Sequence, residues 1–330
     1  MTFGEVPLAE ALGATLAHSV KLDGGVLKKG IVLAAADVAA LRAAGQQTVV
    51  VARLDAGDLD EDTAALRIGA ALANDNLRLG PAFTGRVNLI AERAGVLRVS
   101  TRQVHALNQI NEGLTLATLP DLMRVAPDQL VATVKIIPYG APQDVIAAGV
   151  ATLEGTALEV NPFHGGKARL VMTRTPGFKE SLLEKGEAVV RARLKALNFM
   201  LDDVSIVPHE TGAVASALRP GSDVTLILGA SATSDRLDVA PAAVVAAGGQ
   251  IGRFGMPVDP GNLLFLGTLA GAPVVGLPGC ARSPALNGVD WVLERLAAGI
   301  PVSPDDVAAM GVGGLLKEMP GRPQPRRPRS

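Results

Sequence analysis

The stretch Val224-Thr-Leu-Ile-Leu228, followed by Gly229-Ala-Ser-Ala-Thr-Ser-Asp-Arg-Leu-Asp238, decides the fold of the carboxyl-terminal half of this chain. A short apolar run bounded by glycine is typical of a buried strand, and the small, hydroxyl-rich residues after it indicate a loop. Two further loops, at 255–262 and 278–284, also adjoin apolar runs. In an open parallel sheet, loops at the carboxyl ends of strands line one crevice where ligands bind. These stretches therefore predict a small-molecule site for a phosphorylated ligand.

The overall composition is that of a globular protein without a nucleic-acid signature. The chain has 330 residues, room for two or three domains at roughly 150 residues each. Its net charge is −1, which argues against a nucleic-acid partner or an anionic membrane surface. Aromatic residues make up only 3%, so the core is aliphatic and base-stacking platforms are not expected.

Cysteine content and the lack of targeting signals bear on the compartment. Cys280 is the only cysteine, which excludes an internal disulfide and a cysteine zinc cage and fits a reducing cytosol. The amino terminus lacks the basic start and apolar core of a signal peptide. No apolar run reaches the roughly 18 residues that a membrane span needs. We expect a cytoplasmic protein with no membrane and no nucleic-acid partner.

Residues 165–302 alternate between apolar strand-like runs and helical stretches. Such alternation favours an α/β domain with a mostly parallel sheet covered on both faces. Strands are expected at 167–173, 203–207, 224–228, 250–256, 263–267 and 274–277, and helices at 180–198, 210–218, 239–247 and 284–298.

Residues 1–160 are expected to form a smaller, mixed α+β region, and 303–330 a disordered tail. The tail ends in a run rich in proline and arginine, typical of disorder. Helices are expected at 6–12, 36–44, 63–74 and 104–112, and strands at 48–52, 96–99 and 129–138.

An acidic run at 55–62 allows two interpretations. Asp58, Asp60 and Asp62 alternate as in a calcium loop, but the glycine and distal glutamate of the EF-hand pattern are not in place. Acidic residues also favour the first turn of a helix. A helix start is the better interpretation.

The loop after the strand at 224–228 has the composition of an anion-binding loop. Gly229 and its small neighbours let backbone N–H groups approach a phosphate, and the hydroxyls of Ser231, Thr233 and Ser234 add donors. The Gly-Lys-Ser/Thr ending of a Walker loop is missing. An ordinary turn would have the same composition, so both interpretations stay open at this point.

Two carboxylates close this loop. Asp238 stands directly before an expected helix, where it would serve as an N-cap or hold a divalent cation or a polar ligand group. Asp235 is more ambiguous, and Arg236 between them would pair with either carboxylate.

The next two loops differ in how strongly they predict a site. Residues 259–262 indicate a turn, punctuated by Pro260 and Gly261, from which Asn262 would reach a heterocycle or a phosphate. Residues 278–284 are the best local anion site. Pro278 and Gly279 open the loop.

At the end of that third loop, Ser283 is placed as an N-cap with Pro284 at the first helical position. Free N–H groups there would attract phosphate, and Arg282 adds positive charge. Cys280 is read as an ordinary thiol, because no general base adjoins it.

A fourth loop, from Thr173 to Glu180, also joins an expected strand to an expected helix. Gly177 lies at its centre, and Arg174 and Lys179 would contact phosphate while Glu180 would bind a metal. Helix capping is the alternative. The four histidines, His18, His105, His164 and His209, form no metal-ligand pattern, although His209 lies at a strand end near the same crevice.

Taken together, these loops resemble the molybdopterin-binding domain of molybdenum-cofactor biosynthesis proteins, which include molybdopterin adenylyltransferase and molybdopterin molybdotransferase. The resemblance covers 167–300 and rests on 229–241, on Val258-Asp-Pro-Gly-Asn262, and on Val274-Val-Gly-Leu-Pro-Gly279 with Ser283. It implies a three-layer α/β/α domain with a mostly parallel sheet. Residues 1–55 are similar, less specifically, to the opening of the molybdotransferases. The combination looks closest to a subgroup associated with molybdenum-cofactor cytidylyltransferases.

The departures from the family pattern affect the groups linked to molybdate insertion. Ala230 replaces the second glycine of the first loop, Asn262 replaces a lysine, and Cys280 replaces an asparagine. The family's Gly-Asp-Glu signature is replaced by Pro176-Gly-Phe-Lys-Glu180. The resemblance therefore implies ligand binding more firmly than catalysis.

The resemblance implies a molybdopterin-binding protein of molybdenum-cofactor biosynthesis that transfers molybdate or a nucleotide onto molybdopterin. Asp238 and Asp235 would be catalytic, with Asp238 holding Mg²⁺ and with ATP or CTP as nucleotide. The partners would be molybdopterin or its nucleotide form and a molybdenum-cofactor nucleotidyltransferase, with a homo-oligomer as assembly. The ligand-binding residues would be Thr173, Gly177, Gly229, Ser231, Thr233, Ser234, Pro260, Gly261, Asn262, Pro278, Gly279, Arg282 and Ser283.

Two alternatives stay open. One is a non-catalytic carrier or sensor of the finished cofactor, which the altered lysine and asparagine positions favour. The other is an unrelated nucleotide-sugar or phosphosugar enzyme with a similar sheet, because fold alone does not fix function.

Overall fold

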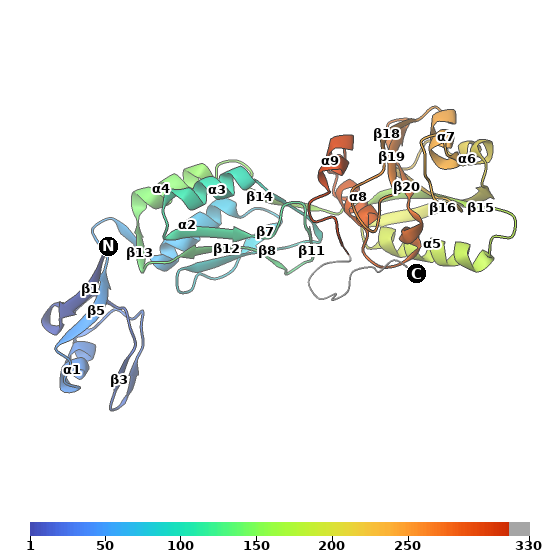
Figure 1. The fold of residues 1–330 in the computed structure, drawn as a ribbon. Coiled ribbons are helices and arrows are strands. Elements are labelled where there is room, and N and C mark those ends of the chain that lie inside the picture. The colour runs from blue at the N-terminus through green and yellow to red at the C-terminus, as the bar shows by residue number, and fades with distance from the viewer. Residues whose placement is uncertain (317–330) are drawn as a thin grey trace, which may run out of the picture. The chain divides into compact units, whose positions relative to one another are not determined.

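The computed structural model describes residues 1–316, and the chain divides into two compact units, Met1–Asn161 and Pro162–Ser330 (Figure 1). We call them the amino-terminal and carboxyl-terminal units. The sequence predicts a boundary between 160 and 165, and the structure divides after Asn161. Among the residues described, no helix has the length and apolarity that a membrane crossing requires.

A six-stranded sheet forms the centre of the carboxyl-terminal unit, in the order β16-β15-β17-β20-β19-β18. Its strands are β15 (Gly166–Arg174), β16 (Phe199–Pro208), β17 (Val224–Leu228), β18 (Gln250–Phe254), β19 (Phe265–Leu269) and β20 (Ala272–Leu277). The first four strands in that order run parallel, whereas β19 is antiparallel to both β20 and β18. The unit is therefore α/β with a mixed sheet.

The antiparallel pairings of β19 make the sheet mixed, so the expected parallel arrangement is found only for β16, β15, β17 and β20. β19 and β20 are joined only by Ala270 and Gly271, whose φ angles are 49° and 82°. A two-residue link with positive φ at both positions is a hairpin turn, and it forces the two strands to be antiparallel. The dipeptide carries no strong turn signal in the sequence, so the expected strands were placed too far apart.

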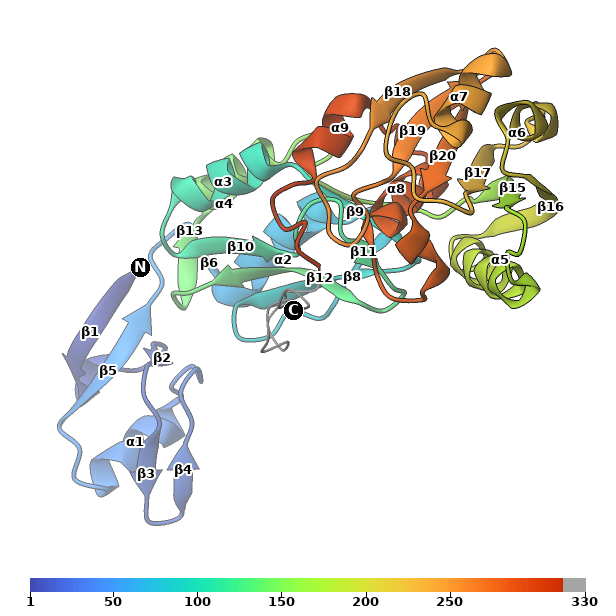
Figure 2. The same ribbon diagram turned by 45° about the vertical axis from the view of Figure 1, so that its right-hand side comes forward.

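Helices cover both faces of this sheet (Figure 2). They are α5 (Glu180–Lys195), α6 (Thr211–Ala217), α7 (Val239–Ala246), α8 (Gly288–Ala297) and α9 (Pro304–Ala309), with the 3₁₀ helix η2 (Gly279–Arg282).

One face of the sheet packs against α6 and α7. Val214 of α6 and Val244 of α7 share a fully buried cluster with Val171, Ile227 and Phe265 of the strands. Burying each such side chain contributes about 1.5–3 kcal/mol. Alternate strand residues point to the opposite face.

On that opposite face, Leu228 lies against α5. A Cβ built on Gly186 of α5 would come within 3.0 Å of the Leu228 side chain. Glycine at this position therefore lets the helix approach the sheet closely.

Residues 303–316 are folded, which corrects the expectation of a disordered tail beginning at 303. The Ser303 hydroxyl accepts the N–H of Asp306 and caps α9. Beyond the helix, Leu315 forms a bridge with Asp259, and the N–H of Leu316 donates to the Asp259 carbonyl. The rest of the expected tail, 317–330, lies outside the described residues.

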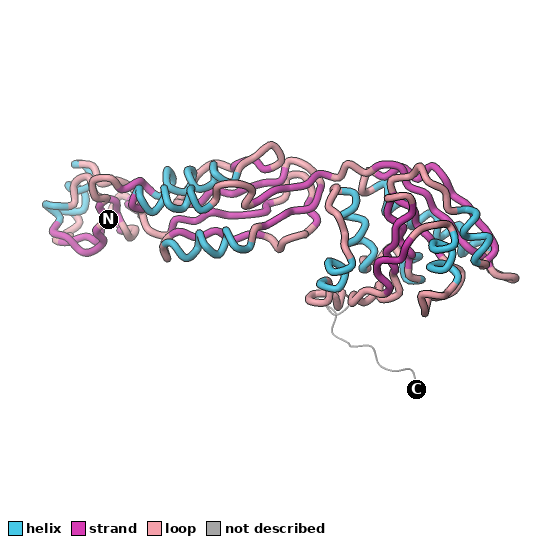
Figure 3. The backbone as a smooth tube through the Cα atoms, turned by 90° about the horizontal axis from the view of Figure 1, so that it is seen from above, coloured by secondary structure: helices cyan, strands magenta, loops and turns pink. Residues whose placement is uncertain are grey.

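The amino-terminal unit is a mixed α+β structure with two apolar clusters, rich in short strands (Figure 3). The cluster nearer the amino terminus is built around Leu16, Leu41 and Val51, and the second around Ile68, Leu107 and Val134.

The helices of this unit are η1 (Leu8–Glu10), α1 (Ala35–Ala43), α2 (Glu61–Leu72), α3 (Thr101–Ile110) and α4 (Gln143–Thr152). Its strands are β1 (Thr2–Pro7), β2 (Thr15–Leu16), β3 (Val20–Leu22), β4 (Gly25–Leu27), β5 (Thr48–Arg53), β6 (Asp58–Asp60), β7 (Leu77–Leu79), β8 (Arg86–Ala91), β9 (Gly95–Val99), β10 (Leu114–Thr118), β11 (Arg124–Val125), β12 (Leu130–Ile136), β13 (Gly140–Pro142) and β14 (Leu158–Pro162).

Two segments of this unit, the start of the chain and the acidic run at 55–62, follow the expectations to different degrees. The helix expected at 6–12 is wrong in its first part, because Thr2–Pro7 is a strand paired with β5 and only Leu8–Glu10 turns helically. The helix start expected in the acidic run is confirmed. The Asp60 carboxylate accepts the N–H groups of Asp62 and Thr63 at the start of α2, at 3.1 and 2.9 Å.

Candidate ligand site at the carboxyl edge of the sheet

The sheet topology brings the loops singled out in the sequence to one edge. β16, β15, β17 and β20 are parallel, so the loops that follow them emerge on the same side. β18 is antiparallel to β19, which is antiparallel to β20, so the loop leaving β18 lies on that side too. Loops at this position in α/β sheets form ligand sites.

A hydrogen-bonded network joins three of these strand ends. Thr173, at the end of β15, is completely buried. Its Oγ1 accepts the backbone N–H of Ala230 at 2.7 Å and lies 2.8 Å from Nδ1 of His209. Thr173 therefore links the loop after β17 to the residue that follows β16.

This network assigns the tautomer of His209. A threonine hydroxyl has one hydrogen to donate, and a buried polar hydrogen without an acceptor costs about 1–3 kcal/mol. Ala230 only donates to Thr173, so the hydroxyl hydrogen has His209 Nδ1 as its acceptor. The neutral ring then carries its own hydrogen on Nε2, the nitrogen that Thr173 does not engage.

His209 also lines a cavity of about 400 Å³. The cavity combines residues of the loop after β15 with those at the end of β16: Arg174, Thr175, Pro176, Gly177, Phe178, Pro208, His209 and Glu210.

Arg282 connects the third loop to the first. Its Nη2 donates to the carbonyl oxygen of Gly229 at 2.7 Å, and its guanidinium lies 5.9 Å from the centre of the Phe178 ring. Its Nε is buried and has no hydrogen-bond partner within the described part of the chain. Burial lowers the pKa of the Arg282 guanidinium, which nevertheless stays protonated at neutral pH. A cation with an unsatisfied N–H suits an anionic ligand group.

Arg193 of α5, which the sequence analysis missed, holds the third loop in place. It donates to the carbonyl oxygens of Ala281 and Ser283, each at 2.7 Å, and of Ala285 at 2.9 Å. Its Nε lies 2.7 Å from the Asp290 carboxylate of α8. Nothing in the sequence marks this arginine, because its partners lie about ninety positions away along the chain.

The expectation that Ser283 caps the following helix is wrong. Ser283 ends η2, and α8 begins at Gly288 with Asn287 as N-cap, in a capping box with Asp290. The amide and carboxylate of that box provide both reciprocal bonds, which fixes the start further along.

The first N–H groups of α8 already have protein acceptors. Val289 N–H donates to Asn287 Oδ1, and Gly288 N–H donates to the Pro260 carbonyl. These groups are not available for the phosphate that the sequence placed at this helix start.

The two carboxylates of the first loop are engaged with backbone. Asp238 caps α7 by accepting the N–H of Val239 at 2.8 Å, and its other oxygen accepts the N–H of Ser234 at 3.1 Å. Asp235 accepts the N–H of Leu237 at 2.7 Å. Arg236 donates to the carbonyl oxygen of Ile251 instead of pairing with either aspartate.

The turn expected at 259–262 lies one residue further along, at 260–263. The N–H of Leu264 donates to the Gly261 carbonyl at 3.0 Å, and Pro260 is buried. The Asn262 side chain is exposed, with its amide nitrogen 3.4 Å from the Met256 carbonyl within its own loop.

The remaining predicted residues lie in the loops of the same edge. Ser231 and Ser234 are exposed and Thr233 is half-buried, whereas Pro278 is buried and Gly279 is exposed. Gly177 has a φ of 77°, which glycine adopts readily.

The part of the chain that the structure describes shows no preformed metal cage. Within residues 1–316, no three histidine, cysteine or acidic side chains gather as metal ligands. Mg²⁺ commonly uses one or two carboxylates together with ligand phosphates, so Asp238 alone would hold it only through the ligand.

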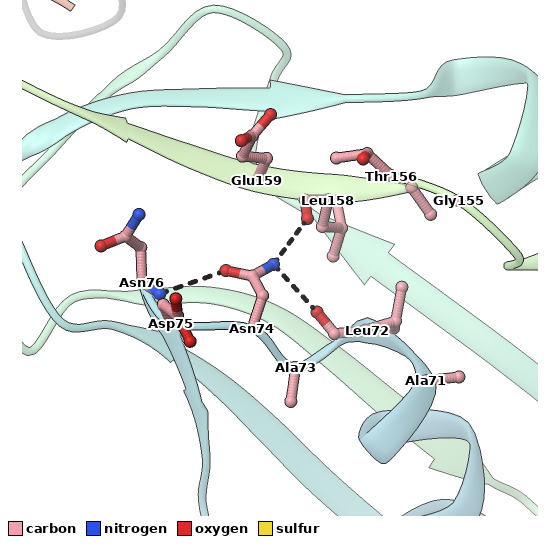
Figure 4. A pocket seen from close by; sticks show the side chains of 11 residues that line it. Ala71, Leu72, Ala73, Asn74, Asp75, Asn76, Gly155, Thr156, Leu158 and Glu159 are labelled. Atoms are coloured by element: carbon pink, nitrogen blue, oxygen red, sulfur yellow. Dashed lines mark hydrogen bonds between the residues drawn. The ribbon is translucent and has the colours of Figure 1, made fainter.

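A second cavity, of about 350 Å³, lies in the amino-terminal unit between the end of α2 and the start of β14 (Figure 4). The Asn74 amide at its centre donates to the Leu158 carbonyl at 3.0 Å and accepts the N–H of Asn76 at 3.2 Å. Asn76 in turn donates to the Val160 carbonyl at 3.1 Å. The two amides therefore connect the segment after α2 to β14 across the cavity.

Comparisons with known proteins leave the family of the whole chain open. A family model described as a domain of unknown function (DUF8806) matches residues 5–53. No curated protein matches the chain.

Similar solved structures are named as molybdenum-cofactor proteins. The molybdopterin biosynthesis MoeA protein from Pyrococcus horikosii is 13% identical with a TM-score of 0.31, over 90% of this chain and 76% of that one. A molybdopterin biosynthesis protein from Mycobacterium abscessus is 16% identical with a TM-score of 0.28, over 41% of this chain and 92% of that one. TM-scores at this level do not establish a common fold, so function has to be argued from the residues of this chain.

Proposed function

We propose that the carboxyl-terminal unit binds molybdopterin or its nucleotide form and serves molybdenum-cofactor biosynthesis. The proposal combines the resemblance of the three loops with their meeting at one sheet edge. The carrying observation is the pair of links that join the loops: Thr173 to Ala230 and His209, and Arg282 to Gly229. A preorganised edge of this kind holds a ligand at low entropic cost.

Arg282 would neutralise the phosphate of the ligand. Its Nε–H is buried without a protein partner, and its Nη2 anchors it beside Gly229. The hydroxyls of Ser231, Thr233 and Ser234 would add donors around the phosphate, and the turn at Pro260, Gly261 and Asn262 would add further contacts at the same sheet edge. Because these residues come from separate loops, binding would tie the loops together.

Binding without turnover is the form of this proposal that the geometry favours. The carboxylates of Asp235 and Asp238 are occupied with backbone N–H groups, and the Asn262 amide bonds within its own loop. A transferase would need these side chains to contact its substrates, and here they make hydrogen bonds within the protein. The protein would then carry or sense the cofactor, and a nucleotidyltransferase would be its natural partner.

A transferase that inserts molybdate or transfers a nucleotide is the second candidate. It is favoured by the two aspartates in one loop, of which Asp238 would orient Mg²⁺ bound to phosphates of the ligand and of ATP or CTP. Charge neutralisation and positioning would then be the main contributions to rate.

Isothermal titration of the full-length chain with molybdopterin, with and without Mg²⁺ and ATP or CTP, separates these possibilities. Tight binding without turnover supports the carrier, and nucleotide-dependent turnover supports the transferase. Arg282→Ala should weaken binding by about tenfold or more, because it removes a charge-assisted bond to phosphate. Binding of a nucleotide sugar but not of molybdopterin would select an unrelated nucleotide-sugar or phosphosugar enzyme.

A further inference from the structure

We infer that the cavity lined by His209 and Glu210 is a subsite for a flat heterocycle with a 2-amino-4-oxo edge, the pattern shared by pterins and guanine. The choice of a pterin as its natural occupant rests on the proposed function. The edge of such a ring presents a carbonyl acceptor beside a ring N–H and an amino group, so it needs one protein donor and one carboxylate.

His209 supplies the donor. Thr173 engages Nδ1 at 2.8 Å and sets the neutral tautomer that carries its hydrogen on Nε2. Since Thr173 is fully buried and also holds Ala230 N–H at 2.7 Å, the ring is fixed by the scaffold and not by the ligand. The Nε2–H is then free to donate to a carbonyl oxygen of a ligand in the cavity.

Glu210 supplies the acceptor. It occupies the N-cap position of α6, yet its side chain makes no capping hydrogen bond. Glu210 lines the same cavity as His209 and is exposed there. Two carboxylate oxygens accept two neighbouring N–H groups, which is how a carboxylate reads the amino-imide edge of such a ring.

The remaining walls suit a flat ring better than a bare phosphate. Phe178, Pro176 and Pro208 give the cavity aromatic and apolar surface. The Arg282 guanidinium lies over the Phe178 ring, so charge is available at the border for a phosphate attached to the heterocycle. Arg174 lines the cavity too and would reach a charged substituent of the ring, whereas a phosphate seated beside Glu210 would meet its like charge.

Matched variants of the full-length chain separate the two roles of His209. His209→Gln places an amide N–H near the position of Nε2 and should keep most of the affinity. His209→Asn places its amide near the position of Nδ1, where it can still bond Thr173, but it lacks the outward donor. Glu210→Gln keeps the shape and replaces one acceptor oxygen by a donor.

The probes are pterin-6-carboxylate and guanosine 5′-monophosphate, with lumazine and adenosine 5′-monophosphate as controls that lack the 2-amino-4-oxo edge. Fluorescence titration should show at least about tenfold preference for the pterin over lumazine. His209→Asn should lower pterin affinity by about tenfold, and Glu210→Gln should abolish the preference. In ¹⁵N spectra, the His209 ring should show the Nε2–H tautomer, and its signal should shift on titration. Preference for guanosine monophosphate over pterin would assign the same edge to a guanine nucleotide.

Several results would overturn the inference. They are no preference over the controls, equal binding by wild type and His209→Asn, or no binding of any probe. Failure of the proposed function looks different: the probes bind through His209 and Glu210, but molybdopterin does not bind. Conversely, if Glu210→Gln binds molybdopterin as tightly as the wild type does, the heterocycle subsite is wrong and the proposed function still holds.

Discussion

The cavity lined by Asn74 and the cavity lined by His209 differ in what their polar groups do. In the amino-terminal unit, Asn74 and Asn76 bond backbone carbonyls of β14 and each other, so these amides already have protein partners. At the edge of the six-stranded sheet, Nε of Arg282 lacks a partner in the described chain and Glu210 does not cap its helix. Satisfied polar groups stabilise a fold, whereas fixed but unsatisfied ones are available to a ligand.

The largest loss of stability should come from replacing Arg193, which holds the loop 278–284 in place but does not line the cavity at His209. Arg193→Ala removes three bonds to carbonyl oxygens of the third loop and leaves Asp290 without its ion partner. Because this pair is largely buried, we expect a loss of about 3 kcal/mol of unfolding free energy, measured by urea denaturation.

Arg191 on the same helix is the matched control. It is half-exposed, pairs with Glu187 at i,i+4 and donates to the Leu201 carbonyl at 3.1 Å, so Arg191→Ala should cost about 1 kcal/mol or less. Equal losses for the two variants would show that Arg193 contributes only surface charge or helix propensity.

Thr173→Val should have the next largest effect. Valine keeps the shape but leaves the Ala230 N–H and His209 Nδ1 without their common partner, at a cost of about 2 kcal/mol. Ligand affinity should fall as well, whereas Thr173→Ser, which keeps the hydroxyl, should retain most of both. An unchanged tautomer of His209 in Thr173→Val would contradict the network.

The sequence predicted the strand ends of this edge well and the links between them poorly. The strand at 224–228 is found as expected, because an apolar run bounded by glycine has few other interpretations. The hairpin through Ala270 and Gly271 was missed, because Gly271 favours a turn but alanine at the other position, with a φ of 49°, gives no turn signal in the sequence.

The residues of the candidate site differ in the same way. Residues next to strand ends, such as Thr173, Gly229 and Arg282, could be picked from position and residue type. Arg193 could not, because its bonds depend on two elements far apart in the chain, and Ser283 was misread because a capping box at Asn287 took the helix start. His209 carried the signal of a strand end, but its tautomer follows only from the buried partner.

A smaller loss of stability is expected for a variant in the amino-terminal cavity. This variant tests whether the polar groups there serve the fold and not a ligand. Asn74→Ala leaves the Leu158 carbonyl without its side-chain donor and should cost about 1–2 kcal/mol, with no change in molybdopterin or pterin affinity. Asp75→Asn, at the next position lining the same cavity, should change neither. Weaker ligand binding in Asn74→Ala would mean that this cavity is not merely structural.

The smallest loss of stability should come from replacing Asp60, whose carboxylate accepts hydrogen bonds from Asp62 and Thr63 at the start of α2. Hydrogen bonds from the Thr63 side chain and from backbone N–H groups hold the pKa of Asp60 below its ordinary value. A lowered folded pKa means that the stabilisation is complete above the unfolded value of about 4 and is lost as pH falls through the folded value. Asp60→Ala should therefore cost about 1 kcal/mol at pH 7, as for other N-caps, and less in acid. Asp60→Asn keeps an acceptor but has no charge to lose, so its own stability should not change through this group, and its smaller cost at pH 7 should also shrink in acid as the wild type loses the stabilisation. A cost of Asp60→Ala that persists unchanged at pH 2 would show that the carboxylate's charge contributes nothing to the cap.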